Sequence, residues 1–310
     1  MGEIIHGFEL LKPLENRDAG FSMWTFARRN GKDYFLKKYM TPVYPEEGIM
    51  AKTQWEEAVR SCHAYEEKQT RLYDTINRAS DGNVVRVDAF FRDLTNYYIV
   101  MERIRNENIT CRDIFNSPPV ERLRLCRIIS HSVARLHAAG VVHADLKDKN
   151  ILICRTPAGR YSAKIIDFDC GFLQDSPPGE DEDIGGDQVY TAPEVCRFIA
   201  GESVPLTTKI DVFSLGILFH QYLAGELPGF DTTEYYYLHE SVLDGHPAVI
   251  SENIPEKYRM ILSKMLEKEA EDRCTAQEVC DWLKPASLRR SDPVPAPDPG
   301  SFFMRAPDLT

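Results

Sequence analysis

The sequence lacks the signals of several common protein classes. No apolar run approaches the ~20 residues that a helix needs to cross a bilayer. The first ten residues, MGEIIHGFEL, lack the basic segment of a secretory signal peptide, and His6 stands where an N-myristoylation signal requires Ser or Thr. None of the eight cysteines forms a C-x-x-C pair, so neither a zinc site nor a disulfide framework is indicated. These absences predict a reduced, cytoplasmic protein.

Positive charge is also scarce. The chain has 37 Lys and Arg against 48 Asp and Glu, a net charge of −11. This balance disfavours binding to nucleic acid or to an anionic membrane surface, so neither is expected as a partner. With 310 residues the chain is longer than one hydrophobic core usually supports, and two lobes or two domains are predicted.

The first hundred residues predict strands and one long helix. FARRNGKDYFLKKY, residues 26–39, predicts a hairpin, because Asn30-Gly31 favours the positive-φ turn between two alternating segments. A helix is predicted over residues 46–77, where side chains at spacings of four and three share one face and Glu66 is the only charge on it. Residues 83–91 and 96–104 predict two more strands.

After residue 105 the pattern becomes mostly helical. Residues 119–140 begin with Pro and end with Gly, as a well-delimited helix does. Residues 207–225 are apolar almost all round, which predicts a buried helix, and residues 254–273 and 275–283 are amphipathic. Prolines recur from residue 285 to the end and predict an extended or disordered tail.

The strongest chemical signal is VVHADLKDKNILI, residues 141–153. It places Asp145, Lys147 and Asn150 in one short loop, and Asp167 follows in the segment AKIIDFDCGF. Phosphoryl transfer from ATP needs a carboxylate beside the attacking hydroxyl, a cation on the moving phosphate and oxygen ligands for Mg²⁺. The four side chains supply these groups in that order.

This pattern resembles the eukaryotic-type protein kinase family, whose catalytic loop reads H-R-D-x-K-x-x-N and precedes a D-F-G motif. The resemblance covers about residues 8–284 and includes TAPE at 191–194, DVFSLG at 211–216 and Arg273, which would pair with Glu194. It implies an α+β bilobal fold. Residues 1–104 would form an N-lobe with five antiparallel strands and one long helix, residues 105–286 a helical C-lobe, and residues 287–310 a Pro-rich tail.

The resemblance also implies a role for each residue of the catalytic loop. Asp145 would orient or deprotonate the substrate hydroxyl, and Lys147 would stabilise charge on the transferring phosphoryl group. Asn150 and Asp167 would bind Mg²⁺, and Asp211 would brace the loop. Lys147 stands two residues after Asp145, which resembles the serine/threonine branch of the family.

In the N-lobe, the resemblance makes Lys37 of YFLKK the residue that holds the α- and β-phosphates of ATP. Glu66 would be its ion-pair partner, with the adjacent Glu67 as the alternative. Met101 would line the back of the adenine pocket, and the backbone from Glu102 to Ile104 would meet adenine. The residues expected around the nucleotide are Trp24, Phe35, Lys37, Met101, Glu102, Ile104 and Leu152.

The chain departs from the family at its glycine-rich loop. The best register, RDAGFSMW, places Arg17, Ala19 and Ser22 at the three glycines that let backbone approach phosphate. Trp24 then falls at a valine that covers adenine, and Phe35 falls at a small alanine on the same strand face as Lys37. The two rings either stack on adenine or fill its place.

Three further departures lie in the C-lobe. Ala144 replaces the arginine that receives an activation-segment phosphate, and Asp187 replaces a threonine that bridges the catalytic Asp and Lys. D-F-D stands in place of D-F-G. Since the metal ligand of that motif is its first residue, Asp167, we expect a working variant in which Asp169 removes no ligand.

The sequence thus predicts an ATP- and Mg²⁺-dependent protein serine/threonine kinase of unknown protein substrate. A regulatory protein partner on the long helix is a further possibility. One alternative is a pseudokinase scaffold with weak or altered nucleotide binding, favoured by Trp24 and Phe35. The other is a small-molecule phosphotransferase of the same fold, which the A-P-E segment at 192–194 disfavours.

Overall fold

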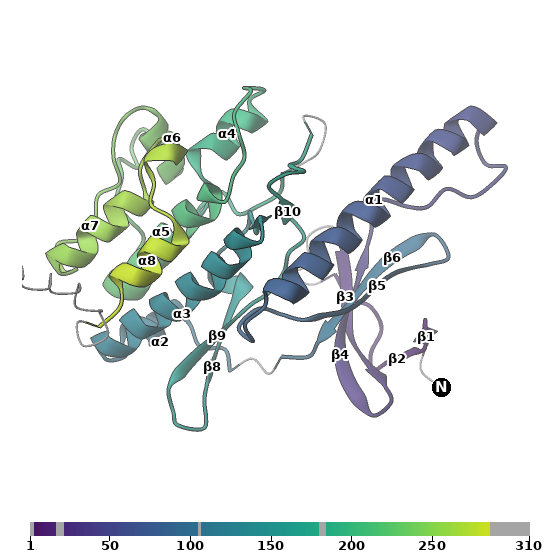
Figure 1. Ribbon diagram of the computed structural model, residues 1–310, viewed down its shortest axis with the longest axis horizontal. Helices are drawn as coiled ribbons and strands as arrows, with labels where there is room; N and C mark the ends of the chain where they lie inside the picture. The colour runs from purple at the N-terminus through teal and green to yellow at the C-terminus, as the bar shows by residue number, and fades with distance from the viewer. Residues whose placement is uncertain (1–2, 17–21, 105–106, 180–183, 286–310) are drawn as a thin grey trace, which may run out of the picture.

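The structure is a computed structural model of the chain and describes residues 3–16, 22–104, 107–179 and 184–285. Two lobes lie beside each other along the longest axis of the molecule (Figure 1). One lobe holds a six-stranded antiparallel sheet and a long helix, and the other is mainly helical. The predicted α+β bilobal fold is confirmed.

The N-lobe sheet has the strand order β1-β2-β3-β4-β6-β5. The hairpin predicted around Asn30-Gly31 is formed by β3 and β4, with φ angles of 52° and 76° at the turn. The sheet has one strand more than expected, because His6 and Gly7 also adopt positive φ and turn β1 back onto β2. Its strands are β1 (Ile4–Ile5), β2 (Phe8–Leu10), β3 (Ser22–Arg29), β4 (Lys32–Tyr39), β5 (Val87–Asp93) and β6 (Asn96–Glu102).

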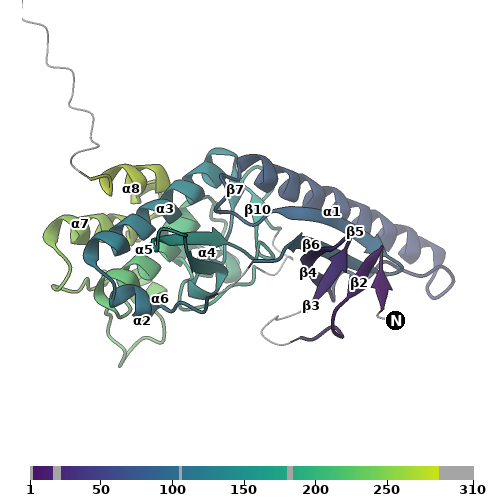
Figure 2. The ribbon, with the colours of Figure 1, turned by 90° about the horizontal axis from the view of Figure 1, so that it is seen from below.

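Helix α1 (Lys52–Ala79) covers one face of this sheet (Figure 2). It begins later than the predicted residue 46, since Gly48 adopts a left-handed φ of 87° that a helix does not accept. The buried side chains of α1 start at Cys62 and continue through Tyr73 to its end, so only the second half of the helix packs tightly against the core.

The C-lobe is built around α3 (Pro119–Ala138) and α5 (Lys209–Ala224). Helix α5 is buried on nearly all sides, as its apolar sequence predicts. Helix α8 packs against α3, and α7 against α5. The remaining helices are α2 (Cys111–Phe115), α4 (Pro193–Ile199), α6 (Leu238–Leu243), α7 (Glu256–Met265) and α8 (Ala276–Trp282).

Two short ladders carry the segments that face the N-lobe. Strand β7 (Val141–Val142) pairs with β10 (Phe172–Leu173), and β8 (Ile151–Arg155) pairs with β9 (Tyr161–Ile165). The loop between β7 and β8, residues 143–150 and here called the catalytic loop, is therefore fixed at both ends.

Some predictions fall outside the described residues. These are the first two positions of the glycine-loop register, Arg17 and Ala19, and the tail from residue 286 onward. Within the described residues, no helix is long and apolar enough to cross a membrane. All eight cysteines are described, and each is a free thiol.

Candidate active site

The catalytic loop is held by a buried carboxylate from the first turn of α5. Asp211 accepts the backbone N–H groups of His143 and Ala144, each at 2.8 Å, and lies 2.9 Å from His137 Nε2. Burial opposes ionisation of Asp211, but the hydrogen bond and charge of His137 keep its pKa below the usual value. Ala144 has a left-handed φ of 62°, a conformation that these bonds stabilise. Asp211 thus braces the loop, as the sequence predicted.

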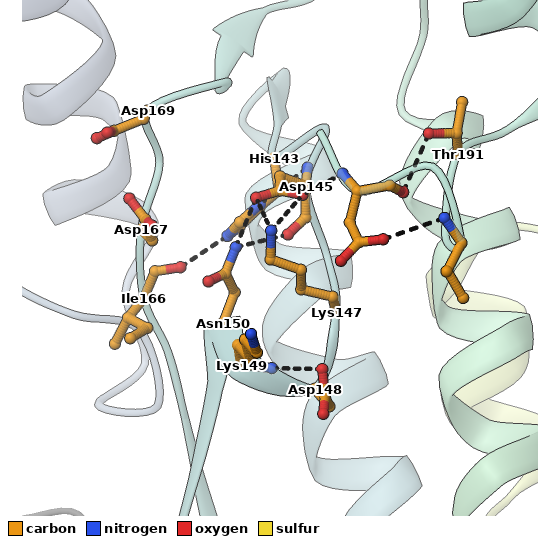
Figure 3. Close-up of polar contacts among 12 residues, drawn as sticks. His143, Asp145, Lys147, Asp148, Lys149, Asn150, Ile166, Asp167, Asp169 and Thr191 are labelled. Carbon is orange, nitrogen blue, oxygen red and sulfur yellow. Dashed lines mark hydrogen bonds and ion pairs between the residues drawn. The ribbon is translucent and has the colours of Figure 1, made fainter. Parts of the chain in front are cut away.

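The carboxylate of Asp145 is oriented by three donors (Figure 3). Lys147 Nζ lies 3.1 and 2.8 Å from its two oxygens. Asn150 Nδ2 donates to both Asp145 Oδ2 and Asp145 O at 2.8 Å, and the N–H of Asp187 donates to Asp145 Oδ1 at 3.0 Å. The side chain that the resemblance assigned to catalysis is therefore held in one orientation by the residues predicted beside it.

Asp187 does not crowd Asp145 with a second negative charge. Its backbone N–H contacts Asp145, whereas its carboxylate accepts the N–H of Val189 at 3.1 Å. The hydroxyl of Thr191 donates to Asp187 O at 3.1 Å and closes the same turn. Asp187 thus takes part in holding the catalytic carboxylate through its main chain.

The end of the activation segment, residues 167–194, is anchored by a buried ion pair. Arg273 donates from both terminal nitrogens to Glu194, at 2.6 and 2.8 Å. The Arg273 side chain has an exposed fraction of 0%. This bidentate pair was predicted from TAPE and EAEDRCT, and it fixes α4 against the base of the C-lobe.

Lys37 lies across the interlobe seam from the catalytic loop. Its Nζ contacts Asp167 Oδ1 at 2.9 Å and Asp169 Oδ2 at 2.6 Å. Burial opposes the charge of Lys37, but the two carboxylates outweigh it and raise its pKa. In turn, burial and then the Asp167 charge raise the pKa of Asp169. The predicted phosphate-binding lysine and metal ligand are thus in direct contact.

The predicted ion pair between Lys37 and Glu66 is wrong for this structure. Glu66 accepts the hydroxyl of Tyr97 at 2.9 Å and Arg92 Nε at 3.3 Å, and it lies 3.1 Å from His63 Nδ1. The helical face was predicted correctly, but the position along the axis was not. Glu66 precedes Tyr73, whose side chain reaches the Lys37 region, by seven residues, about 10 Å along the helix. Glu66 therefore lies over β5 and β6.

Three aromatic rings share the sheet face that carries Lys37. Trp24 is the register partner of Lys37, and Phe26 is that of Phe35. The Trp24 and Phe35 rings stack with centroids 5.4 Å apart, and Phe26 meets both edge-on at 5.6 and 6.1 Å. Phe35 is also the register partner of the buried Met101. The rings that were expected above adenine therefore contact one another.

The remaining predicted nucleotide contacts lie where β6 leaves the N-lobe and β8 begins the C-lobe ladder. The Glu102 carboxylate accepts Lys164 Nζ at 2.7 Å and the N–H of Arg86 at 3.1 Å. Lys164 is in turn the register partner of Leu152. Ile104 packs partly buried against the main core. Their role in adenine binding remains a prediction.

Two residues near Lys37 were missed by sequence reasoning. Tyr39 OH donates to Asp169 Oδ1 at 3.1 Å and lies 2.8 Å from Tyr73 OH. Tyr39 stands two residues after Lys37 on β4, so strand alternation could have placed both on one face. Tyr73 already lay on the predicted helical stripe. No local pattern joins either residue to Asp169.

The comparisons with known proteins agree with this geometry. The model of the protein kinase domain matches residues 45–282, more than half of the 310 residues. The chain belongs to the protein kinase family. The match begins after β4, so strand β3 and Lys37 lie outside it.

Relatives of this kinase carry serine/threonine kinase names. It is 26% identical over 211 residues to serine/threonine-protein kinase DCLK2 of Mus musculus, covering 66% of this chain and 27% of that protein. It is 29% identical over 212 residues to serine/threonine-protein kinase PkaA of Streptomyces coelicolor, covering 67% and 37%. It is 30% identical over 210 residues to calcium-dependent protein kinase 25 of Arabidopsis thaliana, covering 65% and 38%. The matched part spans less than half the length of each relative.

Proposed function

We propose that this kinase is active and transfers the γ-phosphoryl group of ATP to serine or threonine hydroxyls of proteins in a Mg²⁺-dependent reaction. The observation that carries the proposal is the orientation of Asp145 by Lys147, Asn150 and the Asp187 backbone. A carboxylate held in this way can accept the proton of a substrate hydroxyl, while the lysine beside it stabilises charge on the transferred group. The relatives' names and Lys147 support a protein serine/threonine substrate class.

The residues present fit a bound Mg²⁺-nucleotide. Asn150 uses its amide nitrogen on Asp145, which leaves its oxygen for a metal, and Asp167 supplies a carboxylate. Within the described residues no three His, Cys, Asp or Glu side chains form a metal cage. Mg²⁺ in phosphoryl-transfer sites does not need one, since it takes one or two protein ligands together with phosphate oxygens and water. Bound there, the ion would neutralise phosphate charge, while Lys37 binds the phosphates.

A cytoplasmic location is part of the same proposal. It is supported by eight free thiols, which suit a reducing compartment.

The aromatic rings of the N-lobe favour a second candidate, a pseudokinase scaffold. Trp24 and Phe35 stack on each other on the Lys37 face, in the region where a kinase of this fold would receive adenine. If the rings do not part for the base, nucleotide binding fails even though the catalytic loop is complete.

Two measurements on the full chain separate the candidates. Thermal stability is measured with ATP or ADP, each with and without Mg²⁺, and labelled-phosphate transfer is then measured to the kinase itself and to a generic protein. We expect Mg²⁺-dependent stabilisation by ATP and the appearance of phosphoserine or phosphothreonine. Stabilisation without transfer, or neither effect, would contradict the proposal and favour the scaffold.

A further inference from the structure

Asp169 joins three separate parts of the structure. One of its oxygens contacts Lys37 Nζ at 2.6 Å, and the other accepts the hydroxyl of Tyr39 at 3.1 Å. Tyr39 OH lies 2.8 Å from the hydroxyl of Tyr73 on α1. A side chain of the activation segment is thereby bonded to β4 directly and to α1 through one tyrosine.

The second carboxylate on Lys37 has a different prospect. Asp167 also contacts Lys37, at 2.9 Å, but its charge is the one expected to turn toward Mg²⁺. Once Asp167 serves the metal, Asp169 is the counterion left beside the lysine. Glu66, the carboxylate expected for this task, is held by Tyr97 and Arg92.

We infer that Asp169 is a positioning residue: it holds Lys37 toward the nucleotide phosphates from the activation segment, in the place of a carboxylate on helix α1. The inference deepens the proposed function and rests on it. Lys37 alone binds the phosphates, and Asp169 acts through Lys37. Tyr39 and Tyr73 fix the orientation of Asp169, so the position of α1 is transmitted to the lysine through hydroxyl groups.

The first test measures the Lys37–Asp169 contact from stability alone. Denaturant unfolding is compared for wild type, Lys37→Met, Asp169→Asn and the double variant. A matched cycle pairs Lys37→Met with Glu66→Gln. We expect the Asp169 cycle to be clearly non-additive and the Glu66 cycle to be additive. This result does not depend on activity, so an inactive wild type would contradict the proposed function without deciding the contact.

The second test measures positioning through the KM for ATP. Asp169→Asn should raise KM by roughly tenfold or more, with a smaller change in kcat, because Lys37 loses a charged hydrogen-bond partner. Asp175→Asn is the matched control. Asp175 lies in the same segment and pairs with Arg71 of α1, away from Lys37, and its KM should stay within about twofold of wild type.

A rescue distinguishes positioning from a structural role. Gln69 lies one helical turn from Tyr65 and one from Tyr73, on the face of α1 that meets this network. Adding Gln69→Glu to Asp169→Asn supplies a carboxylate from the helix and should recover part of the lost ATP affinity. An additive Asp169 cycle, or a wild-type KM in Asp169→Asn, would overturn the inference. So would loss of Mg²⁺ dependence in Asp169→Asn equal to that in Asp167→Ala, since Asp169 would then be a metal ligand.

Discussion

The two sides of the candidate site follow the kinase pattern to different degrees. On the C-lobe side, Asp145, Lys147 and Asn150 occupy the predicted places and bond to one another. On the N-lobe side, large rings stand where small residues were expected, and Lys37 is paired with Asp169 instead of Glu66. The family match itself begins at residue 45, after the strands that carry these rings and Lys37.

The difference follows from what each side must do. A catalytic carboxylate must point in one direction, and few arrangements of neighbouring donors achieve this. The counterion of a buried lysine needs only to lie within reach of its flexible amine, so any nearby element can supply it. The C-lobe side therefore allows little variation, and the N-lobe side allows more.

The largest expected effect comes from the C-lobe side. Asp145→Asn should reduce phosphoryl transfer by roughly 10²–10⁴-fold while folding and ADP binding are kept, because the amide cannot accept the hydroxyl proton. Initial rates and ADP thermal shifts measure this. Asp148→Asn, an exposed carboxylate in the same loop bonded only to a local N–H in the structure, is the control and should stay near wild type. Equal rates in wild type and Asp145→Asn would show that the assignment is wrong.

The next effect concerns the brace beneath the catalytic loop. Asp211→Ala leaves two buried backbone N–H groups without their acceptor and should lower the free energy of unfolding by about 2–4 kcal/mol. Urea unfolding of the variant measures it. Because Asp211 also fixes Ala144 in its left-handed conformation, activity should fall even at temperatures where the variant is folded. A loss below about 0.5 kcal/mol would mean that the loop holds its shape unaided.

A smaller effect is expected from the rings above Lys37. Trp24→Val with Phe35→Ala should weaken ATP binding by roughly three- to tenfold, because stacking on an adenine base is worth about 1–3 kcal/mol for each aromatic contact at most. Calorimetry on the full chain measures the affinity. Tighter binding in the double variant would mean that the rings occupy the adenine position, which favours the scaffold alternative.

The smallest effect on nucleotide binding should come from Glu66. Glu66→Gln weakens the bonds with Tyr97 and Arg92, and its partly exposed position limits the loss to about 1 kcal/mol of unfolding free energy. The KM for ATP should change by less than about twofold. A KM increase comparable to that of Asp169→Asn would restore the original assignment of Glu66 and remove the contrast between the two sides.

Local patterns made much of this architecture predictable. The Asn30-Gly31 turn, the catalytic-loop spacing and the pairing of Glu194 with Arg273 each depend on short motifs with strong geometric demands. The start of α1 was misplaced because Gly48 adopts a left-handed backbone that an apolar pattern does not reveal.

The partner of Lys37 could not be predicted in the same way. Residues 37 and 169 are far apart in the chain and meet only after the lobes are assembled. The helical stripe gave the face of Glu66 but not which turn of α1 lies over Lys37. That choice depends on how far the helix is shifted along the sheet, which follows from packing around Tyr73 rather than from sequence spacing.

The most direct test is a crystal structure of the kinase with a non-hydrolysable ATP analogue and Mg²⁺. The account predicts that Lys37 Nζ contacts the phosphates while Asp169 stays within hydrogen-bonding distance of it, and that Asp167 and Asn150 bind the metal. Glu66 should still contact Tyr97. A structure in which Lys37 pairs with Glu66, or in which Asp169 binds the metal and leaves Lys37, would contradict it.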